Sequence, residues 1–358
     1  MKRSNLVFSV FSILLFIGCG SSAGVDPHLS LEEQQEITDV NLVGKWKIRR
    51  TSIGSISGKT AVSTANCSID AIEFFDDRSY VLEVSTAETA GDTISKIYRG
   101  KYDLDFVVNN NEPSLNKIVL MDADYLSGTN FPAIGSVATI DEINLSSEEV
   151  SFRIELGQST VDFCITGAAI SLEGDKEEKL EPEAAEDSNH VKIQQEWRLI
   201  DLTAAVQGSS QVNETSQDIC LFLEGDYYDR CYNEETDEFL DDCPQAVSST
   251  LLMSGYGTFL FTYFDANGSA ISSDNGEWRW RADTTLPYSS FMVKGADEDS
   301  FEEGNTTIDV ISITDTTMTL EELYVDTNEA GESMNVTLRY SFQLASLPYQ
   351  DVSCDFDL

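Results

Sequence analysis

Apolar and polar residues alternate along much of the chain, and this period of two predicts antiparallel β-strands with one buried face and one wet face. The clearest runs are residues 150–156 (VSFRIEL) and 336–344 (VTLRYSFQL). The segment DANG at residues 265–268 lies between two such runs and is typical of a tight hairpin turn. About eight runs of this kind occur in each half of the chain, and eight antiparallel strands close naturally into a barrel.

The two halves of the chain resemble each other in the order of their motifs. GKYD at residues 100–103 corresponds to GEWR at residues 276–279. The longest match aligns residues 138–152 (ATIDEINLSSEEVSF) with residues 306–320 (TTIDVISITDTTMTL). A shared order over this length indicates a duplication. The predicted fold class is therefore all-β, with two tandem eight-stranded antiparallel up-and-down barrels.

The repeat also gives the domain organisation. Between the two copies lies a charged segment with few large apolar residues, whose like charges should keep it extended as a linker. Ser30 and Glu33 have the spacing of a capping box and predict a short helix before the first copy. The predicted parts are a signal peptide (1–18), a tether with that helix (19–39), the first barrel (40–172), an acidic linker (173–194), and the second barrel (195–358) with an insertion (213–243).

The N-terminus predicts export and a lipid anchor. Lys2 and Arg3 precede an apolar run at residues 6–17, which is short against the roughly 20 residues that span a bilayer and is typical of a signal peptide. The motif FIGC at residues 16–19 resembles a bacterial lipobox, in which the chain is cut before the cysteine and the cysteine is lipidated. We predict lipidation at Cys19 and a location at the outer membrane or elsewhere in the cell envelope, on either the periplasmic or the surface side. An ordinary signal peptide with an incidental cysteine is the alternative.

The charge balance narrows the possible partners. The chain has 22 Lys and Arg residues against 63 Asp and Glu residues, for a formal net charge of −41. Such a surface repels nucleic acid and anionic lipid headgroups, so we expect neither DNA nor RNA as a partner, and the membrane only through the N-terminal lipid. High solubility explains the charge more simply than a dedicated cation-binding role.

Six cysteines remain once Cys19 is assigned to the lipid, and an even number in an exported chain predicts disulfides. The repeat suggests two equivalent bridges, and proximity in the chain suggests a third one inside the insertion. The scheme is Cys67 with Cys164, Cys243 with Cys354, and Cys220 with Cys231. Six cysteines allow fifteen pairings, so the scheme depends on the repeat.

The start of each copy carries a resemblance to a known family. A helix followed by GKW at residues 44–46 resembles the lipocalin G-x-W signature, and EW at residues 196–197 opens the second copy. Together with the lipobox, the pattern resembles lipocalin-like (calycin) lipoproteins of Bacteroidota-type bacteria. The resemblance implies that Gly44, Trp46 and Trp197 form the barrel bases.

A barrel with aromatic inward faces favours non-catalytic binding of a small apolar or amphipathic ligand, at the end opposite the two base tryptophans. The candidate lining residues are Tyr102, Phe106, Phe152, Trp278, Trp280 and Phe342, each of which could instead be plain core. The alternative function is a structural or interaction role at the cell surface, with closed barrels and the insertion at 213–243 as the contact surface.

Motifs for catalysis are absent from the sequence. Its two histidines, His28 and His190, fall in the predicted tether and linker, so no nucleophilic pair or histidine-based zinc site can be built inside a barrel. No phosphate-binding or dinucleotide-binding motif occurs. The acidic insertion lacks the spacing of a calcium-binding loop and is interpreted as a solvated loop. We predict no enzyme activity, metal or cofactor; a hydrolase with two buried carboxylates converging inside one barrel is the third hypothesis.

Overall fold

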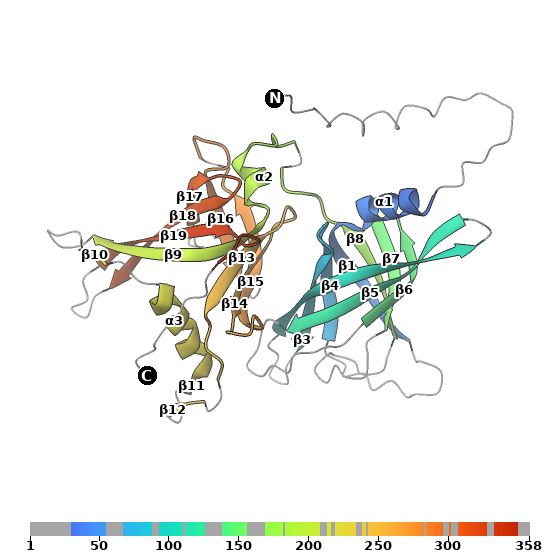
Figure 1. The fold of residues 1–358 in the computed structure, drawn as a ribbon, viewed down its shortest axis with the longest axis horizontal. Coiled ribbons are helices and arrows are strands. Elements are labelled where there is room, and N and C mark those ends of the chain that lie inside the picture. Colours follow the sequence, from blue (N-terminus) through green and yellow to red (C-terminus); the bar gives the residue numbers. More distant parts are fainter. Residues whose placement is uncertain are drawn as a thin grey trace.

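The computed structural model contains two closed antiparallel barrels that lie side by side (Figure 1). The prediction of two eight-stranded barrels is confirmed. The predicted signal peptide and Cys19 lie outside the described residues. These are residues 30–54, 67–87, 93–109, 112–125, 138–155, 169–181, 183–207, 213–215, 219–233, 238–240, 243–282, 284–295, 301, 307–327 and 333–349.

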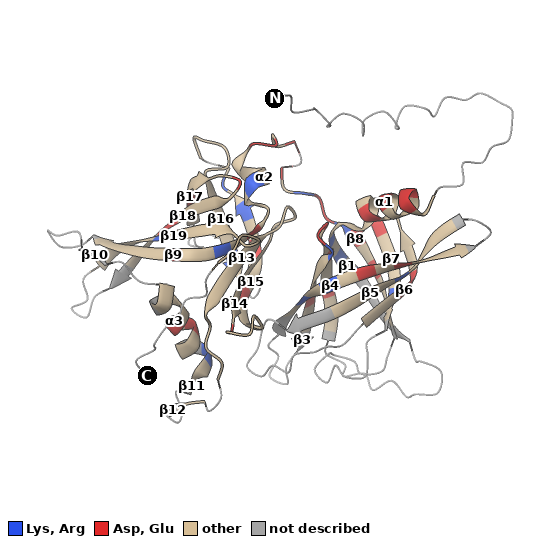
Figure 2. Cartoon of the chain, in the orientation of Figure 1, with Lys and Arg blue, Asp and Glu red and all other residues tan. Residues whose placement is uncertain are grey.

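The first barrel is a meander in which each strand pairs with the next, and β1 also pairs with β8 to close the sheet. The helix α1 precedes it, begins at the capping box predicted from Ser30 and Glu33, and carries acidic residues (Figure 2). The elements are α1 (Leu31–Leu42), β1 (Gly44–Gly54), β2 (Cys67–Phe74), β3 (Ser79–Ala87), β4 (Thr93–Asn109), β5 (Glu112–Tyr125), β6 (Ala138–Leu145), β7 (Glu149–Glu155) and β8 (Ala169–Lys176).

The second barrel repeats this topology. Its first strand, β9, pairs with β13 near its start and with β19 along most of its length, which closes the sheet. The strands are β9 (Glu196–Gln207), β13 (Ser248–Met253), β14 (Thr258–Phe264), β15 (Ala270–Trp280), β16 (Ser290–Gly295), β17 (Thr307–Ile313), β18 (Thr317–Thr327) and β19 (Ser333–Leu344).

The insertion between β9 and β13 is structured. It comprises β10 (Asn213–Thr215), which pairs with the end of β9, the helix α3 (Ile219–Cys231), and a small hairpin of β11 (Tyr232–Asn233) and β12 (Glu238–Phe239). The interpretation of this segment as a solvated loop is therefore wrong, because α3 buries Ile219 and Leu223 in the core of the second barrel.

A disulfide joins Cys231 to Cys243, with their Cα atoms 5.9 Å apart. The predicted pairs Cys220–Cys231 and Cys243–Cys354 are thus wrong. Cys220 and Cys231 belong to one helix, where their positions are roughly 16 Å apart at 1.5 Å per residue, too far for a disulfide. Cys220 is itself disulfide-bonded. The predicted pair of Cys67 with Cys164 is not tested, because Cys164 lies outside the described residues. Cys354 lies outside them as well.

The linker predicted at residues 173–194 is partly folded. β8 extends into it as far as Lys176, and α2 (Asn189–Ile193) occupies its end. The N–H of Glu177 donates to a carbonyl of β1, and the N–H of Leu180 donates to a carbonyl in the turn between β13 and β14, both at 2.8 Å. These backbone bonds hold the linker against both barrels, although its charge favours an extended chain.

A buried tryptophan closes one end of each barrel in the same way. Trp46 and Trp197 are fully buried. The indole Nε1 of Trp46 donates to the carbonyl of Leu42 at the end of α1 (2.8 Å), and that of Trp197 donates to the carbonyl of Ile193 at the end of α2 (3.1 Å). The acceptor stands four residues before the tryptophan in both copies, so each helix is fixed across the base of its barrel.

The fourth strands of the two barrels are also equivalent. The hydroxyl of Tyr102 donates to the carbonyl of Phe75 (2.9 Å), and the indole Nε1 of Trp278 donates to the carbonyl of Ser254 (3.0 Å). In each barrel the acceptor is the first residue of the turn between the second and third strands. The two halves therefore share positions as well as topology, which supports the alignment of GKYD with GEWR.

The barrels contact each other through the outward faces of β2–β4 and β13–β14. Val81 and Ile97 of the first barrel form an apolar cluster with Leu252 and Leu260 of the second. All six residues of β13 are buried, because one of its faces lines the second barrel and the other meets the first. The usual wet face of an antiparallel strand is absent here.

Buried polar groups flank this apolar contact. The Lys45 ammonium donates to the Glu83 carboxylate (2.8 Å) and to the Thr258 hydroxyl of the second barrel (3.0 Å). Glu73 is buried beside them and accepts hydrogen bonds from Thr258 and Ser254. Burial raises the pKa of Glu73 to about 7, against the opposing effect of the Lys45 charge. The contact between the barrels thus contains a carboxyl group that titrates near neutral pH.

We expect Glu73→Gln to remove a pH-dependent loss of stability. The folded protein holds the Glu73 proton up to a pKa of about 7, whereas the unfolded chain releases it near 4.5, so the wild-type free energy of unfolding falls as pH rises through this interval. Across this pH interval, the free energy of unfolding of the wild type falls by on the order of 3 kcal/mol relative to that of the variant. Urea unfolding at about pH 5 and about pH 8 measures the difference. The exposed Glu148→Gln is the control, and equal pH slopes for wild type and Glu73→Gln would contradict the assignment.

Candidate functional site

A cavity of about 280 Å³ lies inside the second barrel. Its wall consists of inward-facing side chains from seven strands and one residue of α3. The aromatic members are Phe222, Phe259, Phe261, Tyr263, Phe291, Tyr340 and Phe342, and the aliphatic members are Leu251, Met253, Val293, Ile308 and Leu320. The cavity is therefore mainly apolar and rich in aromatic rings.

The alternation of the strands explains this wall. Phe259, Phe261 and Tyr263 take successive inward positions on β14, whereas Leu260 between them packs against the first barrel. Gly276 on β15 leaves room for the ring of Phe259, since a Cβ atom there would lie 2.8 Å from that ring. The period-two pattern read from the sequence thus supplies the lining, and the contact with the first barrel supports β14 from outside.

The helix α3 contributes one side of the cavity. The ring of Phe222 packs against those of Phe261 (5.6 Å between centroids), Tyr263 (5.8 Å) and Tyr340 (6.5 Å). The Ser272 hydroxyl on β15 donates to Asp226 of the same helix (2.6 Å). These contacts place the inserted helix over the aromatic interior, where ring packing adds to the burial of apolar area.

Two carboxylates also line the cavity, Asp274 from β15 and Glu322 from β18. The hydroxyl of Tyr340 donates to Oε2 of Glu322 (3.0 Å). Burial and the neighbouring Glu322 charge raise the pKa of Tyr340 well above its ordinary value, so it stays a neutral donor. No Lys, Arg or His is among the described residues that line the cavity. Its polar groups are therefore two carboxylates and two tyrosine hydroxyls, with no cation among them.

A buried histidine lies beneath this barrel. Nδ1 of His190 on α2 accepts from the indole Nε1 of Trp280 (2.8 Å), and its ring also neighbours Trp278 and Tyr288. Desolvation lowers the pKa of His190 below its ordinary value. The prediction from sequence assigned His190 to the linker, because nothing in its local pattern shows that α2 packs against β15.

The structure brings only one of the six predicted lining residues into the cavity, which is Phe342. Trp278 is buried beside Phe291 (5.9 Å between ring centroids). Trp280 packs on α2, where its indole N–H donates to His190. The remaining three belong to the first barrel: Tyr102 and Phe152 are in its apolar core, and Phe106 is half-buried. The predicted base residues Trp46 and Trp197 lie at the bases, and Gly44 adjoins Tyr256 and Lys176.

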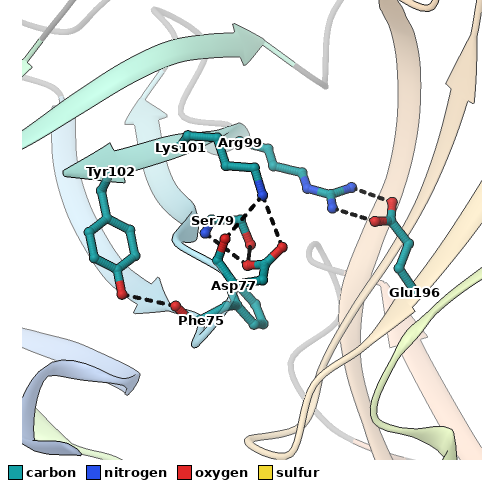
Figure 3. Close-up of polar contacts among 7 residues, drawn as sticks. All are labelled: Phe75, Asp77, Ser79, Arg99, Lys101, Tyr102 and Glu196. Atoms are coloured by element: carbon teal, nitrogen blue, oxygen red, sulfur yellow. Dashed lines mark hydrogen bonds and ion pairs between the residues drawn. The ribbon is translucent and has the colours of Figure 1, made fainter. Parts of the chain in front are cut away.

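A second, more polar cleft of about 710 Å³ lies between the barrels. The Arg99 guanidinium of β4 crosses it to form two hydrogen bonds with the Glu196 carboxylate of β9 (2.7 and 2.8 Å; Figure 3). Burial alone would raise the pKa of Glu196, but its bonds and charge pairing with Arg99 outweigh this and lower it. Beside this pair, Lys101 binds Asp77 (2.9 Å; Figure 3). The cleft is thus spanned by an ion pair that joins the barrels.

Two further findings concern the described residues alone. No described helix is both long and apolar enough to cross a membrane. No group of three or more His, Cys, Asp or Glu side chains among them could hold a metal ion.

Comparison with known proteins gives distant structural likenesses. No protein-family model matches the sequence, and no curated protein matches it. A transferrin binding protein B double mutant from Haemophilus parasuis is 11% identical with a TM-score of 0.20, over 87% of this chain and 59% of that one. An intact Ap-TbpB with N and C lobes is 9% identical with a TM-score of 0.18, over 76% and 54%. A Nostoc punctiforme protein of unknown function from the DUF3598 family is 10% identical with a TM-score of 0.20, over 87% and 98%.

The chain spans somewhat more than half the length of the transferrin binding proteins that it matches. With TM-scores of 0.18 to 0.20, these likenesses say nothing of a ligand or partner of this chain.

Proposed function

We propose that this chain is a lipid-anchored envelope protein that binds a small apolar or amphipathic molecule in the second barrel without changing it chemically. The observation that carries the proposal is the aromatic cavity of about 280 Å³ inside that barrel. Concave, mostly apolar sites with a few converging polar groups are the usual form of small-molecule sites. The lipocalin-like arrangement inferred from the sequence agrees with a site at this place.

The size of the cavity limits the ligand. An apolar cavity of about 150 Å³ holds one benzene molecule. A volume of about 280 Å³ therefore suits a bicyclic ring or a ring with a short chain, rather than a long acyl chain. The described interior of the first barrel is a continuous apolar core that includes Tyr98, Ile154 and Leu172, so we place the ligand in the second barrel.

The two cavity carboxylates do not favour the hydrolase hypothesis. Asp274 is exposed at the edge of the cavity, whereas Glu322 is half-buried and bonded to Tyr340. A general acid in such enzymes needs a carboxyl group whose apolar surroundings keep it protonated. An exposed aspartate lacks those surroundings, and binding without catalysis fits the pair better.

Filling the cavity should abolish binding. We expect Val293→Phe, which places a ring in the cavity, to weaken the binding of indole at least about tenfold, or about 1.4 kcal/mol. Isothermal titration calorimetry with indole measures the affinity. The matched control is Met292→Phe, the neighbouring position on the opposite face of β16. Wild-type protein that binds no indole, and carries no small molecule in native mass spectrometry, would overturn the proposed function.

Removing the lipidated cysteine should release the protein from the membrane. We expect Cys19→Ser expressed in a Gram-negative host to move from the membrane fraction to the soluble fraction and to lose labelling by radioactive palmitate. A multiply acylated terminus anchors durably because each buried CH₂ contributes about 0.8 kcal/mol. Cys243→Ser, which leaves the lipobox intact, is the control. Labelling that persists in Cys19→Ser would exclude this residue as the lipid site.

The second candidate function is protein contact through the insertion. Tyr228 and Leu240 are exposed around the disulfide-stapled hairpin, where the Tyr228 ring stacks on that of Tyr232 (4.6 Å between centroids). We expect the double variant Tyr228→Ser with Leu240→Ser to lose any envelope partner captured by cross-linking, while it retains indole binding. An unchanged set of cross-linked partners would argue against this surface.

A further inference from the structure

We infer that the molecule bound in the second barrel is a small organic ammonium ion, with an aromatic or alkyl body and a positively charged amino group. This inference rests on the proposed binding function and adds the chemical class of the ligand. Three features of the molecule support it: the sign of the charges on the cavity wall, the aromatic rings beside them, and the differences from the first barrel.

The carboxylates give the sign of the charge. Asp274 and Glu322 enter the cavity wall from different strands, and no cationic side chain is among the described lining residues. An anionic ligand such as a fatty acid would face both carboxylates at short range, in a protein with a net charge of −41. A neutral apolar ligand would leave the half-buried carboxylate of Glu322 with the Tyr340 hydroxyl as its hydrogen-bond partner. A ligand ammonium adds a charge-assisted hydrogen bond to that carboxylate.

The aromatic rings suit the same group. The rings of Phe222, Phe261, Tyr263 and Tyr340 pack around one another on one side of the cavity. The face of an aromatic ring attracts a cation, and the attraction grows where water is excluded. Tyr340 also donates its hydroxyl proton to Glu322, which leaves the other oxygen of that carboxylate for a ligand N–H. The aromatic rings and the carboxylate thus line the same cavity, a combination that suits an ammonium group.

The first barrel provides an internal comparison. Equivalent positions in the two barrels follow from the two sequence matches and the strand pairings. The matches are GKYD with GEWR and residues 138–152 with 306–320. Three polar positions of the cavity are Asp274, Glu322 and Tyr340, and the first barrel has Tyr98, Ile154 and Leu172 there. These three are buried in the apolar core of that barrel. Both carboxylates therefore distinguish the second copy from an otherwise equivalent barrel.

The inference can be tested with three ligands that share one indole ring. Tryptamine carries an ammonium group, tryptophol a neutral hydroxyl, and indole-3-propionate a carboxylate. By isothermal titration calorimetry near neutral pH, we expect tryptamine to bind at least about tenfold more tightly than tryptophol, and indole-3-propionate to bind most weakly. Tryptamine is protonated there, because an alkylamine has a pKa of about 10.4.

Variants assign the selectivity to the cavity. We expect Glu322→Gln to remove most of the ratio between tryptamine and tryptophol affinity, since an amide carries no charge for the ammonium group while its oxygen can still accept from Tyr340. Asp274→Asn provides a second, independent variant at the exposed edge of the cavity. The control is Glu321→Gln, adjacent on β18, where the carboxylate faces outward and binds Arg339 (2.7 Å). The control should keep the full preference.

The outcomes separate the two proposals. If tryptophol or indole binds wild-type protein as tightly as tryptamine, the ammonium inference is wrong and the binding function stands. If tryptamine preference persists unchanged in both Glu322→Gln and Asp274→Asn, these carboxylates are not its source, and the inference also fails. If none of the indole ligands binds, the proposed function fails first and takes the inference with it.

Discussion

An indole N–H buried at the base of a barrel must find an acceptor, and this requirement organises both halves of the molecule. Trp46 and Trp197 are fully buried, and each donates to the last turn of the helix that precedes its strand. An unsatisfied donor at such a position would cost about 1–3 kcal/mol. The bond therefore holds α1 and α2 across the bases, and the cavity of the second barrel lies further up the interior, beside Phe222 of α3.

The same strands that line the cavity also join the barrels. β13 and β14 present Leu251, Phe259 and Phe261 inward, and present Leu252 and Leu260 outward to the first barrel. A wall that is packed on both faces has little freedom to shift, because protein interiors are close to crystal density. The first barrel thus acts as a support for the cavity of the second, and the ion pair of Arg99 with Glu196 strengthens that support from the side.

The sequence predicted most of the fold and little of the site, for physical reasons that particular residues illustrate. Alternation and the repeat suffice for two barrels, since the strands follow from a local period of two and their division into two copies follows from the order of motifs. Glu321 and Glu322 are adjacent and chemically alike, yet only strand register decides that Glu322 faces the cavity and Glu321 the solvent. The pairing of Cys220 with Cys231 failed because proximity in the chain does not show that both residues belong to one helix. His190 was misplaced because its burial depends on tertiary contact.

The differences between two equivalent barrels are more informative than either barrel alone. Both copies keep the base tryptophan and the bond from the fourth strand to the turn, which fix a helix across the base and a turn to the strand beside it. Among the described residues, the second copy alone carries a helix, α3, between its first two strands and acidic residues at two of the compared inward positions. Glu322 is half-buried and bonded to Tyr340, whereas Asp274 is exposed at the cavity edge. The proposed cationic ligand would interact favourably with both carboxylates. The inserted helix, whose Phe222 ring lies over the cavity, adds the aromatic surface that such a ligand prefers.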